Sequence, residues 1–441
     1  MIQSIGTLKQ LLDTQCLSDA RLNEFQSGKL RDVVKLAYEK VKYYRNIFQL
    51  AGIRPEDIKD ITDISKIPIT TKKDFQGNSP RDLIDSGINP EDCVVKHTSG
   101  STGQPLSFYF RPGERDFQTL LNLRILLANG YKLTDKTTYL INPHRFPKGR
   151  LWFQHLGVLR RYYLSVFDDP EVHREAILTI RPDIIYGYPS NLTLLGLLFR
   201  EKGMDGFQPK AVYSSAETLE EGPRALIAST MNVDVYDILG LVETGDIAWE
   251  CSAHEGYHLN SDAVLMEFLD ENDKPVPPGQ PGRLVCTSLY ALTMPLIRYD
   301  TGDICVPLDK HCSCGRTLPL MESIKGRAND FIVLPSGNII ASCFLVILMQ
   351  GFVNVAQYRI LQEDRNSLRV QIVKGKGFDG ETPRKIEEEI RKVTGHTIGI
   401  HVEIMEMLER DNSGKIRTVV SRVIPDFADK LKSSFDLRRW V

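Results

Sequence analysis

The chain has 441 residues, enough for two or three domains with a sizeable hydrophobic core. Hydrophobic residues make up 42% of it and charged residues 25%, as in ordinary soluble globular proteins. The formal net charge of -2 argues against nucleic acid as the main partner, and the longest apolar run, 343–349, is far too short to span a bilayer.

The first residues, Met1-Ile-Gln-Ser-Ile-Gly6, lack the charged start and long apolar run of a signal peptide. We therefore expect a cytoplasmic protein with small-molecule partners and no membrane association. In a reducing compartment, the eight cysteines are expected to be free thiols or metal ligands rather than disulfides. The sequence leaves open whether the chain is a monomer or a homodimer.

Residues 1–90 are predicted to be mainly helical. The stretch 30–44 places a set of apolar side chains near one helical face: Val33, Val34, Leu36, Ala37 and Val41. Pro68 and the pair Thr70-Thr71 indicate a turn, with Thr71 as the N-cap of a helix through Phe75.

From about residue 93 onward, strand-like runs alternate with helical stretches. Strands are expected at 137–142, 183–186, 211–215, 233–239 and 283–289, and helices at 114–129, 171–180, 190–202 and 219–230. This alternation favours βαβ units, a largely parallel sheet and an α/β fold.

Between about 250 and 325, turn signals separate short strands and predict a small β-rich subdomain. A composition shift near 326–330 indicates a boundary, and beyond it strands near 355–361, 367–373 and 400–406 accompany a charged helix at 382–394. We expect a large N-terminal α/β domain over 1–326, with mixed parallel sheets flanked by helices, and a small α+β C-terminal domain over 327–441.

The stretch His97-Thr-Ser-Gly-Ser-Thr-Gly-Gln-Pro105 packs hydroxyls and glycines into one turn between two strand-like runs. Such a turn can aim backbone N–H groups and hydroxyls at one anion, and glycine allows the backbone to approach closely. An ordinary polar hairpin is the alternative, and the motif alone does not decide between them.

Three further motifs carry groups suited to nucleotide chemistry. Glu243 follows a strand-like run and offers a carboxylate for Mg²⁺. Arg298 offers a planar guanidinium for phosphate or carboxylate, and Asp303 offers two acceptor oxygens suited to ribose hydroxyls. Lys415 offers a compact positive charge. Each motif alone is better explained as a surface loop or a solvated charge.

Seven motifs follow one another along the chain: TSGSTG, YGYPS, SSAETL, GLVETG, RYDTGD, KGRAND and SGKIR. In this order, and with the stretches 37–45 and 67–74, they resemble the adenylate-forming enzymes, the superfamily of acyl-CoA synthetases and peptide-synthetase adenylation domains. The resemblance covers nearly the whole chain and is closest to the phenylacetate–CoA ligase branch, including its capsule-biosynthesis adenylate-forming ligases.

The resemblance implies a role for each matching residue. The phosphate loop would consist of Thr98, Ser99, Gly100, Ser101, Thr102 and Gly103. Other nucleotide contacts would be Ser215, Ala216, Glu217, Tyr236, Asp237, Gly240, Arg298, Asp303, Arg327 and Lys415. The acid would be held by Tyr186, Gly187, Tyr188, Pro189, Ser214, Gly240 and Leu241. Catalysis would rest on Lys415, Glu243 as the Mg²⁺ ligand, Thr98 and Ser99.

The implied reaction joins a carboxylic acid to ATP as an acyl adenylate and releases pyrophosphate, after which a second nucleophile displaces AMP. The C-terminal domain of these enzymes is mobile and rotates between the two steps, and the hinge position here is Asn329. Because Asn329 and the stretch 334–341 depart from the branch, CoA, an amine and a hydroxyl all stay open as acceptors. A non-catalytic nucleotide-binding protein on the same fold is a further alternative.

Two clusters in the β-rich region are suited to a tetrahedral zinc site. Cys251 and His258 form the first, and Cys312 and Cys314 form the second. His254 and His311 are rival ligands, and a pair of reduced cysteine loops is the alternative. The same pattern occurs in members of the resembled branch, where a zinc ion would be structural.

The residues do not specify the acid, and a small aromatic acid is what the resemblance implies. The stretch 143–150 is both basic and aromatic, and it is suited to a polar or anionic substrate tail. A solvated loop explains that stretch equally well.

Overall fold

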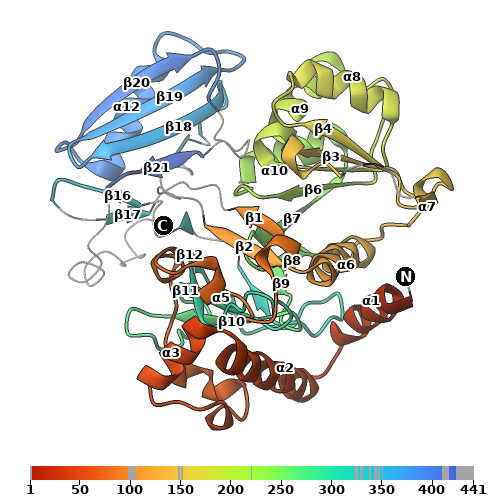
Figure 1. Cartoon of the computed structure of the whole chain (residues 1–441). Coiled ribbons are helices and arrows are strands. Elements are labelled where there is room, and N and C mark those ends of the chain that lie inside the picture. The colour runs from red at the N-terminus through yellow and green to blue at the C-terminus, as the bar shows by residue number, and fades with distance from the viewer. Residues whose placement is uncertain are drawn as a thin grey trace.

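The computed structural model describes residues 2–97, 106–147, 149, 152–219, 221–322, 326–327, 331–336, 339–341, 345, 348–349, 351–409 and 417–423. The elements form a large α/β body and a small C-terminal domain, which lie apart in Figure 1. No helix of the described part is long and apolar enough to cross a membrane.

A nine-stranded sheet forms the centre of the large body. Its strands follow the order β13-β14-β9-β8-β7-β6-β5-β3-β4. Their bounds are β3 Thr137–Ile141, β4 Arg161–Ser165, β5 Ile184–Gly187, β6 Ala211–Ser215, β7 Asp234–Leu241, β8 Gly245–Glu250, β9 Tyr257–Leu259, β13 Pro307–Leu308 and β14 Leu320–Met321. Strands β3 to β7 run parallel to one another, and β8, β9, β14 and β13 continue the sheet in antiparallel fashion.

Helices cover both faces of this sheet, because alternate residues of each strand point to opposite faces. Ile185, Val212 and Val235 pack with apolar residues of α8 (Pro170–Ile180), α9 (Pro189–Lys202) and α10 (Glu221–Met231). The opposite face packs against α6 (Pro112–Ala128), and the short α7 covers Trp152–His155.

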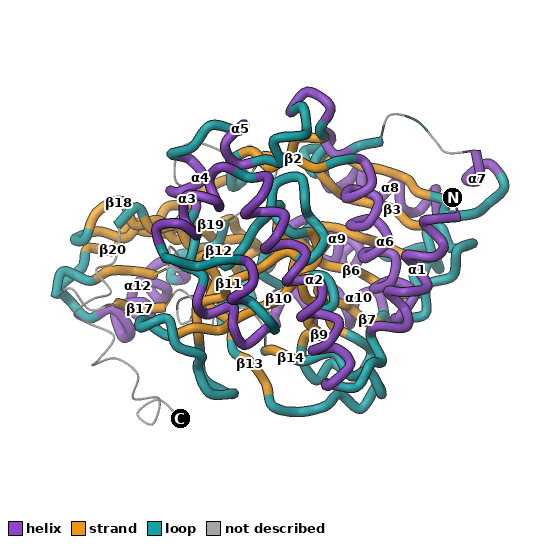
Figure 2. Tube along the Cα trace, turned by 60° about the horizontal axis from the view of Figure 1, so that its bottom comes forward, coloured by secondary structure: helices purple, strands orange, loops and turns teal. Residues whose placement is uncertain are grey.

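A second sheet has the order β10-β11-β12-β15 and lies under the N-terminal helices (Figure 2). Its strands are β10 Val264–Leu269, β11 Gly282–Ser288, β12 Tyr299–Cys305 and β15 Gly326–Arg327. The helices are α1 Ile2–Thr14, α2 Asp19–Lys40, α3 Lys42–Leu50, α4 Lys72–Gln76 and α5 Pro80–Leu83, and short 3₁₀ turns cover Pro55–Asp57, Ile61–Lys66, Pro90–Asp92 and Pro143–Arg145. A separate hairpin pairs β1 (Val94–His97) with β2 (Ser107–Phe110).

The C-terminal domain is an α+β unit whose four-stranded sheet has the order β20-β19-β18-β21. Its elements are β16 Phe331–Val333, β17 Ile339–Ala341, β18 Val355–Asp364, β19 Ser367–Lys374, α12 Thr382–Thr394, β20 Gly399–Met405 and β21 Val419–Ser421. Ile386 and Ile390 of α12 pack on Ile360, Val370 and other apolar residues of this sheet.

Two local predictions are wrong in detail. The stretch 30–44 is not one helix, because Val41 adopts an extended conformation (φ -113°, ψ 113°) between α2 and α3. The β-rich region is not a separate unit throughout, since β9, β13 and β14 extend the central sheet through antiparallel pairing.

Candidate active site and metal cluster

The β1–β2 hairpin flanks the predicted phosphate loop. Its register runs from Val94↔Phe110 to His97↔Ser107, so the loop connects two paired strand ends. At this end His97 Nδ1 lies 3.0 Å from Ser107 Oγ. The residues Thr98 to Gly103, and Lys415 as well, lie outside the described residues, and their roles stay predictions.

The carboxyl ends of three neighbouring parallel strands bring the predicted acid-binding residues together. The register pairs Gly187 of β5 with Ser214 of β6, and Ser214 with Asp237 of β7. Tyr188 and Pro189 follow β5 directly at the start of α9. Because ligands of open α/β sheets bind beyond such strand ends, this edge is the best place for a reactant.

Asp237 joins β7 to β8 and β9. Tyr257 donates its hydroxyl to Asp237 Oδ2 at 2.8 Å, and the Asp237 N–H donates to Glu250 Oε2 at 2.8 Å. Burial is the main reason why the pKa of Asp237 rises to about 6. These contacts give Asp237 a place in the packing of the sheet, and its contact with the nucleotide stays a prediction.

The segment after β6 is tied to the segment after β5. Ala216 has φ +75°, a conformation that residues with a Cβ seldom adopt. Next to it, the Glu217 carboxylate accepts the Ser190 N–H at 2.9 Å and the Ser190 hydroxyl at 3.1 Å. A carboxylate at a helix N-terminus is stabilising, so Glu217 holds the start of α9 beside the predicted adenine segment.

Glu243 lies in the tight turn between β7 and β8, as the sequence predicts. The turn is closed by the pair Leu241↔Gly245, and Gly240 pairs with Asp246. A Cβ on Gly240 would lie 2.8 Å from Asp246 Oδ1, so a larger residue here would force the Asp246 carboxylate to move. The turn therefore places the Glu243 carboxylate beyond the end of β7 and the Asp246 carboxylate beside Gly240.

Arg298 is buried and fully engaged with protein groups. Its Nε and Nη2 donate to the Glu267 carboxylate at 3.0 and 2.9 Å, and Nη1 donates to the Ile67 carbonyl at 2.7 Å. The residue thus fastens the N-terminal segment to β10. The sequence motif predicts a place near the nucleotide for Arg298, and that role stays a prediction beside this scaffolding one.

Strand pairing places Asp303, the predicted ribose ligand, beside Arg327. The two residues are direct partners in the antiparallel pair of β12 and β15. Asp303 is 1% exposed, and its N–H donates to Thr301 Oγ1 at 3.1 Å. The predicted ribose site and the Gly326-Arg327 pair before the expected hinge are therefore neighbours.

A row of tyrosines crosses five parallel strands at one register. Its members, in spatial order, are Tyr163, Tyr139, Tyr186, Tyr213 and Tyr236. Neighbouring ring centroids are 5.2 to 6.3 Å apart, and the row faces α6. Only Tyr186 and Tyr236 were singled out from sequence, because the others become neighbours through strand register alone.

The four predicted metal ligands converge. The ligand atoms of Cys251, His258, Cys312 and Cys314 all lie within 4.8 Å of one another. Cys251 Sγ is 3.5 Å from Cys312 Sγ, and Cys314 Sγ is 3.3 Å from His258 Nε2. The pairing of β9 with β14 brings the two clusters together, and Gly315 (φ +82°) closes the turn after Cys314.

Burial favours a neutral imidazole in this cluster. It lowers the pKa of His258 to about 4, with help from the charge of Arg316. The ring lies 5.0 Å from the ring of Trp249, which is fully buried. A neutral imidazole and three cysteine sulfurs, which bind as thiolates, form a donor set typical of structural zinc sites, so the residues present fit the ion.

The two rival ligands lie elsewhere. His254 stacks on Tyr236, with ring centroids 5.4 Å apart and planes 8° apart, and its Nδ1 is 3.9 Å from Glu250 Oε2. His311 is exposed. Neither belongs to the cluster of four.

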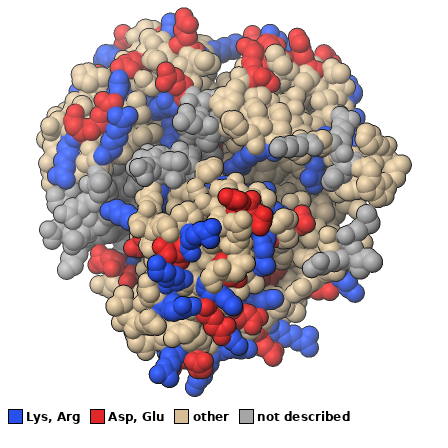
Figure 3. Space-filling model, in the orientation of Figure 1, with Lys and Arg blue, Asp and Glu red and all other residues tan. Residues whose placement is uncertain are grey.

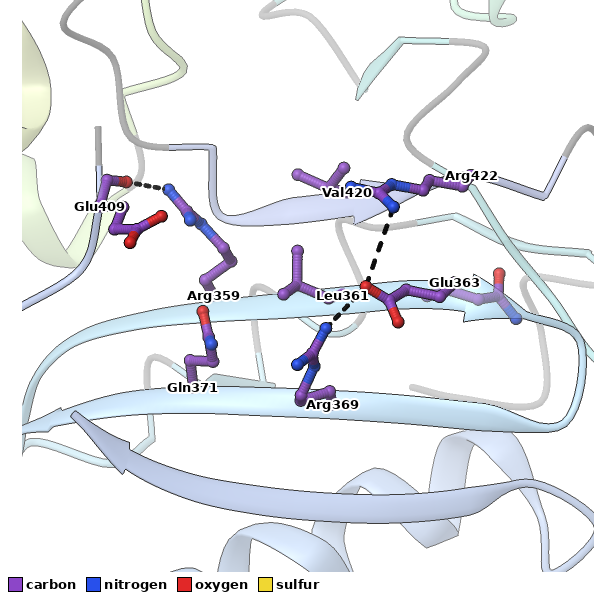
Figure 4. Close-up of a pocket in the computed structure, with 9 residues that line it drawn as sticks. Arg359, Leu361, Glu363, Arg369, Gln371, Glu409, Val420 and Arg422 are labelled. Carbon is purple, nitrogen blue, oxygen red and sulfur yellow. Dashed lines mark hydrogen bonds and ion pairs between the residues drawn. The ribbon is translucent and has the colours of Figure 1, made fainter. Parts of the chain in front are cut away.

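A hollow of about 300 Å³ lies on the C-terminal domain and is lined by residues of β18, β19 and β21 (Figure 4). Arg369 Nη2 donates to Glu363 Oε1 at 2.6 Å, and Arg422 Nη1 lies 3.9 Å from the same carboxylate. Arg359 points to the other side and donates to the Glu409 carbonyl through Nη2 and to the Arg417 carbonyl through Nε at 3.2 Å. No sequence motif marks Arg359, because both of its partners are backbone carbonyls distant in sequence.

Comparisons with known proteins agree with this architecture. The model of the CapK C-terminal domain family matches residues 332–422. The phenylacetate–coenzyme A ligase of Thermus thermophilus is 26% identical over 424 residues, covering 94% of this chain and 92% of the relative. The enzyme of the same name from Escherichia coli is 29% identical over 333 residues, covering 73% of this chain and 74% of the relative.

Among solved structures, 2-hydroxyisobutyryl-CoA ligase in complex with 2-HIB-AMP shares the fold. In its postadenylation state it superposes with a TM-score of 0.78 at 19% identity, covering 92% of this chain and 91% of that one. In the thioesterification state of the same enzyme the TM-score is 0.63. The chain belongs to the adenylate-forming ligase superfamily, where it is phenylacetate–CoA ligase-like and related to CapK.

Proposed function

We propose that this AMP-forming, carboxylate–CoA ligase-like enzyme activates a small aromatic carboxylic acid and transfers it to CoA. A carboxylate oxygen attacks the α-phosphorus of ATP, the bond to the β-phosphate breaks, and pyrophosphate leaves. The CoA thiol then attacks the carbonyl carbon of the acyl adenylate, and AMP leaves. Two relatives are phenylacetate–coenzyme A ligases, which supports an acid of this kind.

The observation that carries the proposal is the meeting of Gly187, Ser214 and Gly240 at one sheet edge, directly before the Glu243 turn. Tyr186 and Tyr213 of the tyrosine row directly precede Gly187 and Ser214 in β5 and β6, which suits an aromatic acid. Mg²⁺ bound by Glu243 would neutralise phosphate charge. Glu217 and the close approach at Gly240 preorganise the segments around the reactants.

A panel of carboxylic acids with ATP and Mg²⁺ tests the activity through pyrophosphate release and trapping of the adenylate by hydroxylamine. We expect turnover with at least one aromatic acid and a CoA thioester when CoA is added. An adenylate that forms but reacts only with an amine or a hydroxyl would replace the CoA step by amide or ester formation. Nucleotide binding without pyrophosphate release from any acid would instead support a non-catalytic nucleotide-binding protein.

Arg359 supports the proposed role of Lys415 in adenylation. It donates to the carbonyls of Glu409 and Arg417, the described residues on either side of 410–416 (Figure 4). Replacing Arg359 with glutamine removes a charged donor shared by both ends of that segment. We expect adenylate formation to slow about tenfold, from charge-assisted hydrogen bonds of roughly 1.5 kcal/mol or more.

The matched control is Arg369→Gln, which removes an arginine from the same hollow but leaves both carbonyls bound to Arg359. It is expected to adenylate at the wild-type rate. Thioester formation from a preformed acyl adenylate should be unchanged in both variants. Equal adenylation rates for the two would show that Arg359 does not position the lysine segment.

We further propose that Cys251, His258, Cys312 and Cys314 hold a structural zinc ion. The cluster lies at the edge where β9 and β14 meet, away from the Gly187 and Ser214 strand ends, so a zinc ion there would stabilise the fold rather than take part in the reaction. Ligand binding to the folded state adds about 4 kcal/mol when free ligand exceeds Kd a thousandfold.

Protein purified without added metal is expected to carry one equivalent of zinc and to melt at a lower temperature after chelation. Cys312→Ser should lose the ion, whereas Cys16→Ser, at an exposed cysteine outside the cluster, should keep it. Elemental analysis and thermal melting provide the readouts. Less than about a tenth of an equivalent of zinc in the wild-type protein would refute the site.

A further inference from the structure

Two cations share one neutral acceptor beneath the predicted phosphate loop. Lys96 of β1 donates from Nζ to Gln118 Oε1 at 2.8 Å, and Arg115 of α6 donates from Nη1 to the same oxygen. Gln118 is buried, and its amide donates to the Tyr290 hydroxyl at 2.8 Å. Both cations are therefore held in place by an amide that carries no charge.

A third cation lies close to these two. Arg145, in the turn after β3, raises the local positive potential at both Lys96 and Arg115. Within the described residues, none of the three forms an ion pair with a carboxylate. Asp246 and Glu243 are the carboxylates whose charge reaches Lys96, without direct contact.

Without a bound anion this arrangement is electrostatically unfavourable for Lys96 and Arg115, which are half-buried, whereas Arg145 is exposed. Buried or half-buried charges are normally paired, because desolvation without a counter-ion is costly. Burial and the neighbouring Arg115 and Arg145 lower the pKa of Lys96 to about 7. An anion placed among the three would supply the missing partner.

The cluster also lies where reactants must meet. Lys96 lies two residues before the predicted phosphate loop, and Glu243, the predicted Mg²⁺ ligand, lies in the turn after β7. Arg145 and Asp246 both act electrostatically on Tyr186, a predicted acid-binding residue. The cluster thus adjoins both the predicted phosphate loop and a predicted acid-binding residue.

We propose that Lys96, Arg115 and Arg145 form a binding site for an oxyanion of a reactant, a carboxylate or a phosphate. The proposal rests on the proposed function for its reactants, but the site can be tested by binding alone. Charge-assisted hydrogen bonds from three cations would hold the anion and shield its charge during attack. Gln118 is a positioning residue that orients two of the donors.

The first experiment measures affinity by calorimetry for ATP, pyrophosphate and phenylacetate separately, alongside the KM of each reactant in turnover. Lys96→Met should weaken one class of ligand about 10- to 100-fold. A change confined to phenylacetate assigns a carboxylate, and a change confined to ATP and pyrophosphate assigns a phosphate. Lys132→Met removes an equal charge from an exposed lysine and should change neither.

Two further variants separate binding from packing. Gln118→Glu keeps the side-chain shape and places a carboxylate against Lys96 and Arg115. We expect this variant to melt at a higher temperature and to bind the anion at least tenfold more weakly. If the cluster were purely structural, the variant would gain stability while its affinity for the three probes stayed unchanged. Lys96→Arg should restore binding.

The affinity should also depend on pH. Above about pH 7 Lys96 loses its proton, so the wild-type Kd should rise about tenfold per pH unit. Lys96→Arg should remove this dependence. Unchanged affinity for all three probes in Lys96→Met would overturn the site, while a wild-type protein that binds them but adenylates no acid would overturn only the proposed function.

Discussion

Replacing Lys415 with alanine is expected to slow acyl-adenylate formation by about 10²- to 10³-fold, the usual loss when one preorganised electrostatic group is removed. In the proposed reaction, negative charge moves from the carboxylate to the leaving pyrophosphate. The chain has glutamine at position 104 and leucine at 106, so the phosphate loop itself supplies no lysine. Charge neutralisation then falls to Lys415, Mg²⁺ and the oxyanion site proposed above.

The measurement is pyrophosphate release in a single turnover, followed by the thioester step started from preformed adenylate. The second step should be unaffected by Lys415→Ala, because phosphate charge no longer develops there. Lys376→Ala, at an exposed lysine of the C-terminal domain, is the control. An adenylation rate equal to that of the control would remove Lys415 from the mechanism.

Replacing Arg124 with methionine is expected to reduce the free energy of unfolding by about 3–5 kcal/mol, the usual cost of breaking a buried ion pair from one side. Arg124 and Asp262 are 0% and 1% exposed, and their closest atoms are 2.5 Å apart. Arg124 also donates to Asn260 Oδ1 at 2.5 Å and to the Leu11 carbonyl at 3.0 Å. The single substitution leaves the Asp262 carboxylate buried with only the Thr14 hydroxyl as a donor from α1.

Urea unfolding followed by circular dichroism provides the measurement. Arg124→Met combined with Asp262→Asn should recover part of the loss, since no uncompensated charge stays buried. Lys42→Met breaks an exposed pair with Asp82 and should change stability by less than about 1 kcal/mol. A loss no larger than that in Arg124→Met would show that the buried network contributes little.

The regular elements of the fold could be predicted from local patterns. Strand β6 and helix α12 have the predicted bounds, and β18 and β20 differ from prediction by three residues or fewer, because apolar alternation and helical spacing are local properties. The edge strand β4 has a half-buried and mixed sequence, so it carried no such signal.

The partners of polar residues were harder to predict, because their spacing in sequence is long. The contact of Arg298 with Glu267 spans 31 residues, and that of Gln118 with Tyr290 spans 172. Cys251 and Cys312 of the metal cluster are also 61 residues apart, yet the cluster was found because cysteine and histidine are rare and chemically distinctive ligands. Lys96 was overlooked because one lysine in a strand has no pattern that separates it from a solvated charge. Figure 3 shows charges of both signs mixed over the visible surface, so the composition offered no guide to the oxyanion site around Lys96.

The indole of Trp249 next to His258 gives the metal cluster an optical reporter. The chain has three tryptophans; Trp249 is fully buried, Trp152 is 62% exposed, and Trp440 lies outside the described residues. Phenylalanine at positions 152 and 440 would leave one tryptophan, with its ring centroid 5.0 Å from that of the imidazole. Cobalt(II), which absorbs visible light when bound by thiolates, would quench its emission, whereas zinc would not. Exchange of one ion for the other could then be followed by fluorescence in real time, without removing metal from the solution.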